Sequence, residues 1–244
     1  MKKLLLTIAA AIFAAALLPG RTPVPGAPFA GMDADLDEDT IVIDSLDSNA
    51  FNAMVAFIEM PAQTLDLLNT SSRLDLLDYY AADSIANVVN SMDGLSHLVR
   101  PLTENYLKVQ VTPVTTLAIK ILPFGKQKIA AISYTIGDSL QAADSDLKFF
   151  DENMTELNRT KFITPATTGD FFNFRGVDSK TRKELLDLVP FPTVEYTFDP
   201  ATEQLHARLT SGEFLGKETV KKISPYLRRD RVYNWDGKKF KLLK

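Results

Sequence analysis

The stretch YLKVQVTPVTTLAIKILPFGKQKIAAISYTI, residues 106–136, decides the fold. It contains three runs that are rich in β-branched and other apolar residues, separated by turn signals at Pro113 and at Pro123–Gly125. Such runs between proline and glycine turns predict β-strands that pair in sequence order. A further run, SDLKFFDENMTEL at residues 145–157, follows another glycine turn. The sequence therefore predicts an antiparallel meander, in which Lys120 lies on a half-buried strand.

Two helical segments precede this meander. Residues 48–68 predict a helix that is broken at Pro61, because the residue before a proline avoids the α region. The next helix is expected to begin at Ser72, which forms an S-x-x-D capping box with Asp75. One half of its helical wheel holds the apolar residues Leu74, Leu76, Leu77, Tyr80, Ala81, Ile85 and Val88, and the other half holds Asp75, Asp78 and Asp83. We therefore interpret these aspartates as solvent-facing residues and not as paired catalytic carboxylates.

The C-terminal part of the chain repeats the mixture of helices and strands. Residues 178–189 predict a helix capped by Asp178 or Ser179, and residues 193–211 predict a hairpin with a turn at Asp199-Pro200. A helix is expected over 216–227. The last segment, RVYNWDGKKFKLL, has Asp236-Gly237 between two runs of large residues, which is typical of a hairpin with a type I′ turn.

These elements predict an α+β fold with helices packed on one or more antiparallel meander sheets. We expect a helix-plus-sheet half over 41–157 and a second, smaller half over 158–244. In each half a Leu-Leu-Asp helix precedes the strands, and the segment FFDENMTEL aligns with NWDGKKFKL. This pattern suggests a duplicated helix-plus-sheet unit.

The N-terminal residues have the pattern of an export signal. Lys2 and Lys3 precede an uncharged apolar run from Leu4 to Leu18, which Pro19-Gly20 ends. That run is shorter than the roughly 20 residues that span a bilayer. We therefore expect a signal peptide over 1–20, with an uncleaved anchor as the alternative. A flexible leader, first proline-rich and then acidic, is expected over 21–40.

Composition narrows the location and the chemistry. No second apolar span follows, so the mature chain is expected to be soluble and not transmembrane, in the periplasm or secreted to the cell surface. The chain has no cysteine, so a lipoprotein, disulfides and thiol catalysis are excluded. The formal net charge is −4, although residues 217–244 carry ten lysines and arginines and three acids. This acidic, exported chain is not expected to bind nucleic acid.

Catalytic and metal-binding signatures are missing from the sequence. Its two histidines, His97 and His206, have no metal-ligand spacing, and H-E-x-x-H, G-x-S-x-G, G-x-G-x-x-G and the P-loop pattern do not occur. The acidic residues over 33–44 resemble a calcium loop, but Glu38 occupies the position that needs glycine. We therefore assign no catalytic, cofactor-binding or metal-binding residue. A catalytic pair of carboxylates has no characteristic sequence motif, so a glycosidase remains an alternative.

The only tryptophan lies in the last hairpin, and it suggests a ligand platform. Tyr233, Trp235 and Phe240 are large rings at alternating or facing positions. Exposed rings of this kind bind sugars by stacking. The alternative is that they pack the hairpin against the rest of the sheet.

Several of these segments together resemble a known family. RLDLLDYY after the Met-Pro helix break, NYLKVQVTPVTTLAIKILPFG, LKFFDENMTEL and YLRRDRVYNWDGKKFK resemble an uncharacterised secreted protein family of Bacteroidales, domain of unknown function family 3256. The resemblance covers nearly all of the mature chain and implies export and a helix-plus-sheet fold, with no assigned activity. Such a source also implies O-glycosylation at Asp-Ser/Thr followed by an apolar residue, for which Thr40 and Ser45 are the favoured candidates.

The sequence thus favours an exported, soluble, non-catalytic binding or interaction protein of the cell envelope. Its expected partner is another envelope protein or a glycan, and no cofactor is expected. The first alternative is a carboxylate-based hydrolase that acts on a carbohydrate. The second is a purely structural envelope component, which the charge separation between the two ends suggests.

Overall fold

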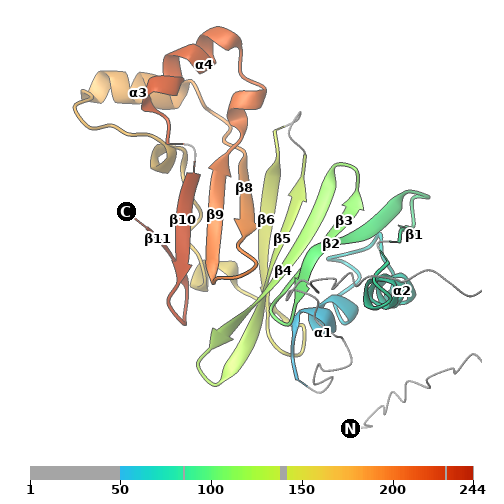
Figure 1. The fold of residues 1–244 in the computed structure, drawn as a ribbon. Helices are drawn as coiled ribbons and strands as arrows, with labels where there is room; N and C mark the ends of the chain where they lie inside the picture. The colour runs from blue at the N-terminus through green and yellow to red at the C-terminus, as the bar shows by residue number, and fades with distance from the viewer. Residues whose placement is uncertain (1–49, 85, 138–141, 229, 244) are drawn as a thin grey trace, which may run out of the picture. The chain divides into compact units, whose positions relative to one another are not determined.

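The computed structural model describes residues 50–84, 86–137, 142–228 and 230–243 (Figure 1). Helix α1 (Ala53–Ile58) and helix α2 (Thr70–Ala81) come first. They are followed by a seven-stranded antiparallel sheet in which each strand pairs with the next along the chain, so the predicted meander is confirmed. Its strands are β1 (Val88–Val89), β2 (Leu95–Thr103), β3 (Tyr106–Thr112), β4 (Thr115–Phe124), β5 (Gln127–Ile136), β6 (Asp144–Phe150) and β7 (Glu156–Leu157).

The rest of the chain forms a four-stranded antiparallel sheet, in the order β11-β10-β9-β8, with two further α-helices. Its elements are α3 (Ser179–Asp187), β8 (Val194–Phe198), β9 (Gln204–Leu209), α4 (Lys217–Ile223), β10 (Asp230–Trp235) and β11 (Phe240–Leu242). Short 3₁₀ helices lie at Arg159–Lys161, Thr168–Phe171, Ser211–Glu213 and Ser224–Tyr226. The α+β fold class is confirmed, as are the Asp178 cap of α3 and the hairpin turn after Phe198.

The two halves differ in the order of their elements. Helix α4 lies between β9 and β10, whereas β2 to β6 follow one another without a helix. The duplicated unit that the sequence suggested is therefore not seen in the described residues. The aligned segments FFDENMTEL and NWDGKKFKL share only a local structure, because β6–β7 and β10–β11 are both short hairpins.

The last hairpin also differs from the expected type I′ turn. Only Gly237 has a positive φ, 85°, and the Asp236 N–H donates to the Lys239 carbonyl at 3.1 Å. The turn is thus centred on Gly237-Lys238, one residue later than predicted. The Asp236 carboxylate accepts the N–H groups of Lys238 and Lys239, which holds Asp236 at the start of the turn and not at its centre.

Both N-terminal helices begin at an asparagine cap. Asn52 Oδ1 accepts the Met54 and Val55 N–H groups, and α1 ends at Ile58, three residues before Pro61. The cap of α2 is Asn69, which accepts the Ser72 N–H at 2.9 Å. Ser72 was predicted as the cap and instead lies in the first turn, because the asparagine three residues earlier already satisfies its N–H.

The face of α2 agrees with the prediction for the aspartates and differs at other positions. Asp75, Asp78 and Asp83 are exposed, so the solvent-facing interpretation is confirmed. Leu74, expected in the core, is 36% exposed, whereas Arg73 is 2% exposed and lies beside the buried leucines. The helix therefore turns a cation toward the core, which the apolar wheel did not indicate.

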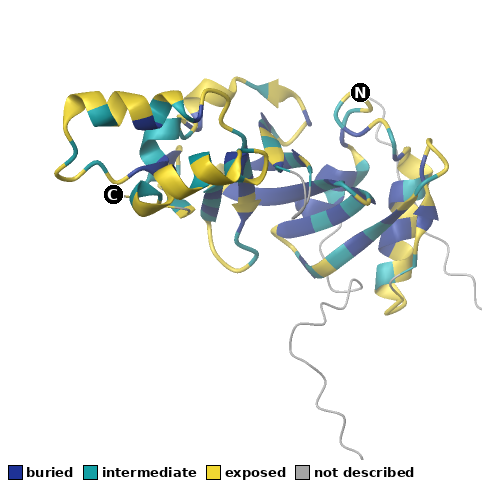
Figure 2. Cartoon of the chain, turned by 90° about the horizontal axis from the view of Figure 1, so that it is seen from above, coloured by how far each residue is buried: buried dark blue, intermediate teal, exposed yellow. Residues whose placement is uncertain are grey.

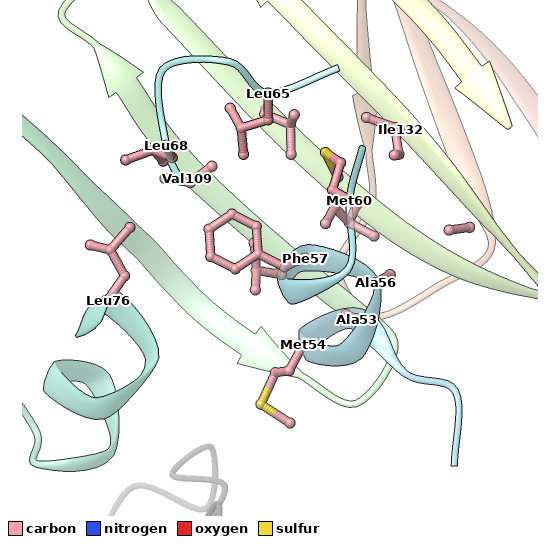
Figure 3. Close-up of a cluster of buried hydrophobic side chains, with 14 of the residues drawn as sticks. Ala53, Met54, Ala56, Phe57, Met60, Leu65, Leu68, Leu76, Val109 and Ile132 are labelled. Atoms are coloured by element: carbon pink, nitrogen blue, oxygen red, sulfur yellow. The ribbon is translucent and has the colours of Figure 1, made fainter. Parts of the chain in front are cut away.

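The central strands of the seven-stranded sheet, β4 and β5, are buried on both faces, and buried residues are concentrated in the middle of the molecule in Figure 2. Leu117, Ile119 and Ile121 of β4 face α1 and α2, and they belong to a core that includes Phe57 and Met60 (Figure 3). The intervening residues of β4 face a second core, which the C-terminal half supplies. The prediction that the strand around Lys120 is half-buried is therefore wrong, because the four-stranded sheet covers the face that was expected to contact solvent.

Hydrogen bonds join the two sheets along β8, which lies beside β5 and β6 (Figure 1). Ser133 Oγ donates to the Tyr196 carbonyl at 2.7 Å, and the Tyr196 N–H donates to Ser145 Oγ at 2.9 Å. The Val194 N–H donates to the Asp144 carboxylate at 3.0 Å. Side chains of the first sheet thus provide hydrogen-bond partners for the backbone N–H and carbonyl groups of β8, the edge strand of the second sheet. Residues from before and after Leu157, where β7 ends, both contribute to the core between the sheets.

Arg73 holds together the irregular chain between α1 and α2. Its guanidinium donates to five backbone carbonyls, those of Phe57, Ile58, Met60, Leu65 and Leu68, at 2.6–3.3 Å. Burial lowers the pKa of this guanidinium from its ordinary value. Because the chain around these carbonyls forms no regular pattern of backbone hydrogen bonds, the carbonyls depend on the arginine for a donor.

Replacing Arg73 with methionine is expected to lower the free energy of unfolding by about 3 kcal/mol or more, because several buried carbonyls lose their donor. Lys180→Met in α3 is the matched control, since that side chain is 87% exposed, and its effect should stay below about 0.5 kcal/mol. Urea unfolding followed by circular dichroism measures both. Equal effects of the two substitutions would contradict a central role for Arg73.

Candidate binding cleft

A cleft of about 510 Å³ lies between the two sheets. Three connections meet there: the β2–β3 turn, the β4–β5 hairpin and the β8–β9 turn. Its lining residues are Thr103, Glu104, Asn105, Lys120, Ile121, Pro123, Lys128, Pro200, Ala201, Thr202 and Glu203. The cleft is thus lined mainly by polar and charged side chains from both halves.

The backbone hydrogen bonds of the fold fix the β2–β3 turn. The Ala53 N–H donates to the Glu104 carbonyl at 2.8 Å, which ties the turn to the start of α1. The Ile121 N–H donates to the Asn105 carbonyl at 2.9 Å, which ties it to β4. Glu104 is therefore presented from a rigid turn, although its own side chain is half exposed.

The β8–β9 turn is held by Asp199. Its Oδ1 accepts the N–H groups of Ala201 and Thr202, each at 2.8 Å. These bonds, with the Thr202 N–H as the largest cause, hold the pKa of the Asp199 carboxyl below its ordinary value. The turn is therefore a fixed wall of the cleft, and it presents Glu203 at the exposed rim.

Lys120 forms the floor between the two sheets. It is 3% exposed, and its Nζ donates to the Asp199 carbonyl at 3.0 Å and to the Pro200 carbonyl at 2.8 Å. Burial lowers the pKa of this ammonium, while the charges of Asp199 and Glu203 oppose that shift. Nucleophilic lysines also have lowered pKa values. Here, however, two carbonyls hold the ammonium, so its observed role is to tie the β8–β9 turn to β4.

Tyr106 lies beneath this lysine. Its ring centroid is 5.8 Å from Lys120 Nζ, within cation–π range, and the residue is 4% exposed. Burial, with a smaller contribution from Asp199, raises the pKa of the Tyr106 hydroxyl to about 12. The ring is thus a neutral, apolar support for the buried ammonium.

Lys128 supplies the exposed cation of the cleft. Its Nζ is 3.3 Å from Glu104 Oε1 and donates to the Phe51 carbonyl at 3.2 Å. The cleft consequently contains two lysines and two glutamates, one pair of which is already joined at the rim. Ionised groups of both signs at fixed positions can bind a polar ligand that carries both donors and acceptors.

The two glutamates do not have the surroundings of a general acid. A catalytic carboxyl that donates a proton near neutral pH usually lies in an apolar pocket. Glu104 and Glu203 are exposed, and Glu104 is paired with a lysine. The arrangement therefore fits binding better than proton transfer.

The aromatic residues that the sequence suggested as a sugar platform are buried. Tyr233, Trp235 and Phe240 are 2%, 5% and 3% exposed. Trp235 Nε1 donates to the Pro123 carbonyl at 2.8 Å, and the Tyr233 hydroxyl donates to the Thr164 carbonyl at 3.1 Å. The exposed platform is thus corrected to a core cluster, because the inner face of the hairpin packs against the first sheet.

Other residues considered from the sequence lie elsewhere. His97 in β2 and His206 in β9 belong to different sheets and are partly buried. The glycosylation candidates Thr40 and Ser45, with the acidic leader, lie outside the described residues. Within the residues that the structure describes, no group of three or more His, Cys, Asp and Glu side chains is placed to hold a metal ion.

Sequence reasoning missed the residues that define the cleft. Lys120 is a lysine within an apolar strand, and this is the one feature of the sequence that indicates a buried cation there. Glu104, Lys128 and Glu203 gave no signal, because they lie in two turns and at the start of β5, in separate parts of the chain. A smaller cavity of about 260 Å³ lies between the α1–α2 segment and β5–β6, and it too has a charged lining that includes Asp66, Asp146 and Lys148.

Stability above pH 10 tests the burial of Tyr106. Between pH 10 and about 12 the unfolded chain loses this proton while the folded chain keeps it, so unfolding becomes easier as pH rises. The Tyr106→Phe variant has no such proton to lose. Over that interval its free energy of unfolding should therefore decrease less than that of the wild type, by a difference of up to about 2–3 kcal/mol. Tyr79→Phe, at a residue 42% exposed, is the control. Parallel pH profiles for wild type and Tyr106→Phe in urea unfolding would refute the assignment.

Comparison with known proteins places the chain in a family. A solved structure of a domain of an uncharacterized protein from Porphyromonas gingivalis W83 has the same fold, with a TM-score of 0.67 and 20% identity over 80% of this chain and 98% of that one. No curated protein matches. A family model, described as a protein of unknown function (DUF3256), matches residues 45–240. The resemblance seen in the sequence is therefore confirmed, and the chain belongs to the DUF3256 family.

Proposed function

We propose that this chain is an exported, non-catalytic binding protein of the cell envelope and that the cleft between its sheets takes a polar segment of a partner protein. The observation that carries the proposal is the lining of the cleft, where Glu104 and Glu203 are presented from hydrogen-bonded turns and Lys128 from the start of β5. The pattern of residues 1–20 supports export, to the periplasm or to the cell surface. No helix among the described residues is long and apolar enough to cross a bilayer.

The chemistry of the cleft favours a polypeptide over a glycan. Sugar sites usually contain an exposed aromatic ring, and the residues that line this cleft include none. An extended polypeptide offers backbone N–H and carbonyl groups together with side chains of both signs. Glu203 and Lys128 are matched to such a ligand, because each is accessible and carries one sign of charge.

Photo-crosslinking from the cleft tests this function. A benzophenone amino acid at Ala201 should crosslink one envelope protein from an extract of the source organism, whereas the same group at Lys183, on exposed α3, should not. Lys128→Ala with Glu203→Ala should weaken capture about tenfold or more, which corresponds to about 1.4 kcal/mol. Because both side chains are partly exposed, the folded state should be preserved. Capture that is equal from both positions, or unchanged in the double variant, would refute the proposal.

One observation favours the alternative of a carbohydrate hydrolase: Glu104 and Glu203 line the same cleft. Two carboxylates across a cleft are the usual machinery of such enzymes. The mature chain should then cleave a member of a glycan panel, and Glu104→Gln and Glu203→Gln should each reduce the rate by about a hundredfold or more. Binding to a glycan without cleavage would instead identify the sugar as the ligand in place of a protein.

A further inference from the structure

A second surface, far from the cleft residues in the fold, combines exposed aromatic rings with lysines. Phe191 is 77% exposed and Phe214 is 54% exposed. The two residues lie at the same end of the β8–β9 hairpin, because the Thr193 N–H donates to Ser211 Oγ at 2.8 Å. Figure 1 shows α3 and α4 beyond that end of the strands. Exposed apolar residues that gather beside polar ones mark interaction surfaces.

The chain that follows Phe214 is basic. Residues 214–228 contain Lys217, Lys221, Lys222 and Arg228 and a single acid, Glu218. All three lysines of α4 are exposed. The nearest acid before this segment, Glu213, lies 3.5 Å from Arg208, so part of its charge is balanced within the protein.

We propose that Phe191, Phe214 and the three lysines of α4 form a face, called here the α4 face, that attaches the protein to an anionic lipid surface. Phenylalanine rings insert into the interface between lipid headgroups and acyl chains, and lysines bind the phosphates around them. The charge distribution supports this partner: the chain as a whole is acidic, with a net charge of −4, so an anionic surface repels most of it and attracts this segment. Attachment through the α4 face is therefore oriented and depends on salt.

The α4 face goes beyond binding in the cleft and does not depend on it. Its residues come from the segments before β8 and after β9 and from α4, whereas the cleft is built around the β2–β3, β4–β5 and β8–β9 turns. Attachment through the α4 face would hold the protein at a membrane while the cleft binds its ligand. Loss of one function by substitution should leave the other intact.

Vesicle binding tests the α4 face. The mature chain should co-sediment with vesicles of phosphatidylglycerol and phosphatidylcholine at least about tenfold more strongly than with phosphatidylcholine alone, and high salt should weaken the binding. Phe191→Ser with Phe214→Ser, and separately Lys221→Gln with Lys222→Gln, should each reduce binding about tenfold. Glutamine has nearly the helix propensity of lysine, so α4 should be preserved.

The control is a second exposed apolar residue at a different place. Met92, in the β1–β2 turn, is 74% exposed, and Met92→Ser should leave vesicle binding unchanged. Because the chain has no cysteine, Phe214→Cys and Met92→Cys each carry a single environment-sensitive fluorophore. The emission at position 214 should shift to the blue on anionic vesicles, and the emission at position 92 should not.

Three outcomes would overturn the proposal. They are absence of binding to anionic vesicles at low salt, binding that the α4-face substitutions do not change, and a blue shift at position 92 and not at 214. If an acidic protein binds the α4 face while anionic vesicles do not, the partner is a protein and the lipid assignment is wrong.

Discussion

The burial of the central strands of the seven-stranded sheet, β4 and β5, on both faces is the constraint on which the rest of the structure depends. A sheet covered on one side alternates apolar and polar residues, but seven of the first eight positions of β4 are buried, and the exception is a partly exposed threonine. Helices α1 and α2 cover one face and the four-stranded sheet covers the other. Each polar group inside either layer must therefore find a partner within the protein.

Two buried cations meet this requirement, one on each side of the sheet. Arg73 donates to carbonyls of the irregular chain between α1 and α2, and Lys120 donates to carbonyls of the β8–β9 turn. Neither has a carboxylate as its direct hydrogen-bond partner in these contacts. Carbonyls outside regular secondary structure need donors, and a long basic side chain can reach several of them from one position. The buried charges thus replace the regular hydrogen bonds that these connections lack.

The same geometry separates structural residues from accessible ones. The large rings of the last hairpin lie between the sheets, where Trp235 stacks on Phe162 and Phe162 in turn stacks on Phe149, and so they cannot serve as a sugar platform. The groups that remain accessible are the charged side chains at the cleft and the rings and lysines of the α4 face. The positions of the turns and ends of the second sheet determine both surfaces more than any sequence motif does.

The sequence by itself determined the type of most elements, although strands β1 and β2 were not expected. The meander, the Asp178 cap, the hairpin after Phe198 and the exposed aspartates of α2 all follow from local periodicity and turn chemistry, which act over a few residues. The three segments that carry Glu104, Lys128 and Glu203 gave no such signal. They meet only because the second sheet packs against the first.

Tertiary structure also decided which polar residues are buried. A helical wheel places an arginine by its neighbours on one helix, but Arg73 is buried because the carbonyls of another segment surround it. Likewise, Lys120 and Trp235 lie between layers whose contact joins residues about 80 and 112 positions apart. Local sequence fixed which face of each element is apolar, whereas long-range packing fixed what each face meets, because burial is a property of the assembled layers.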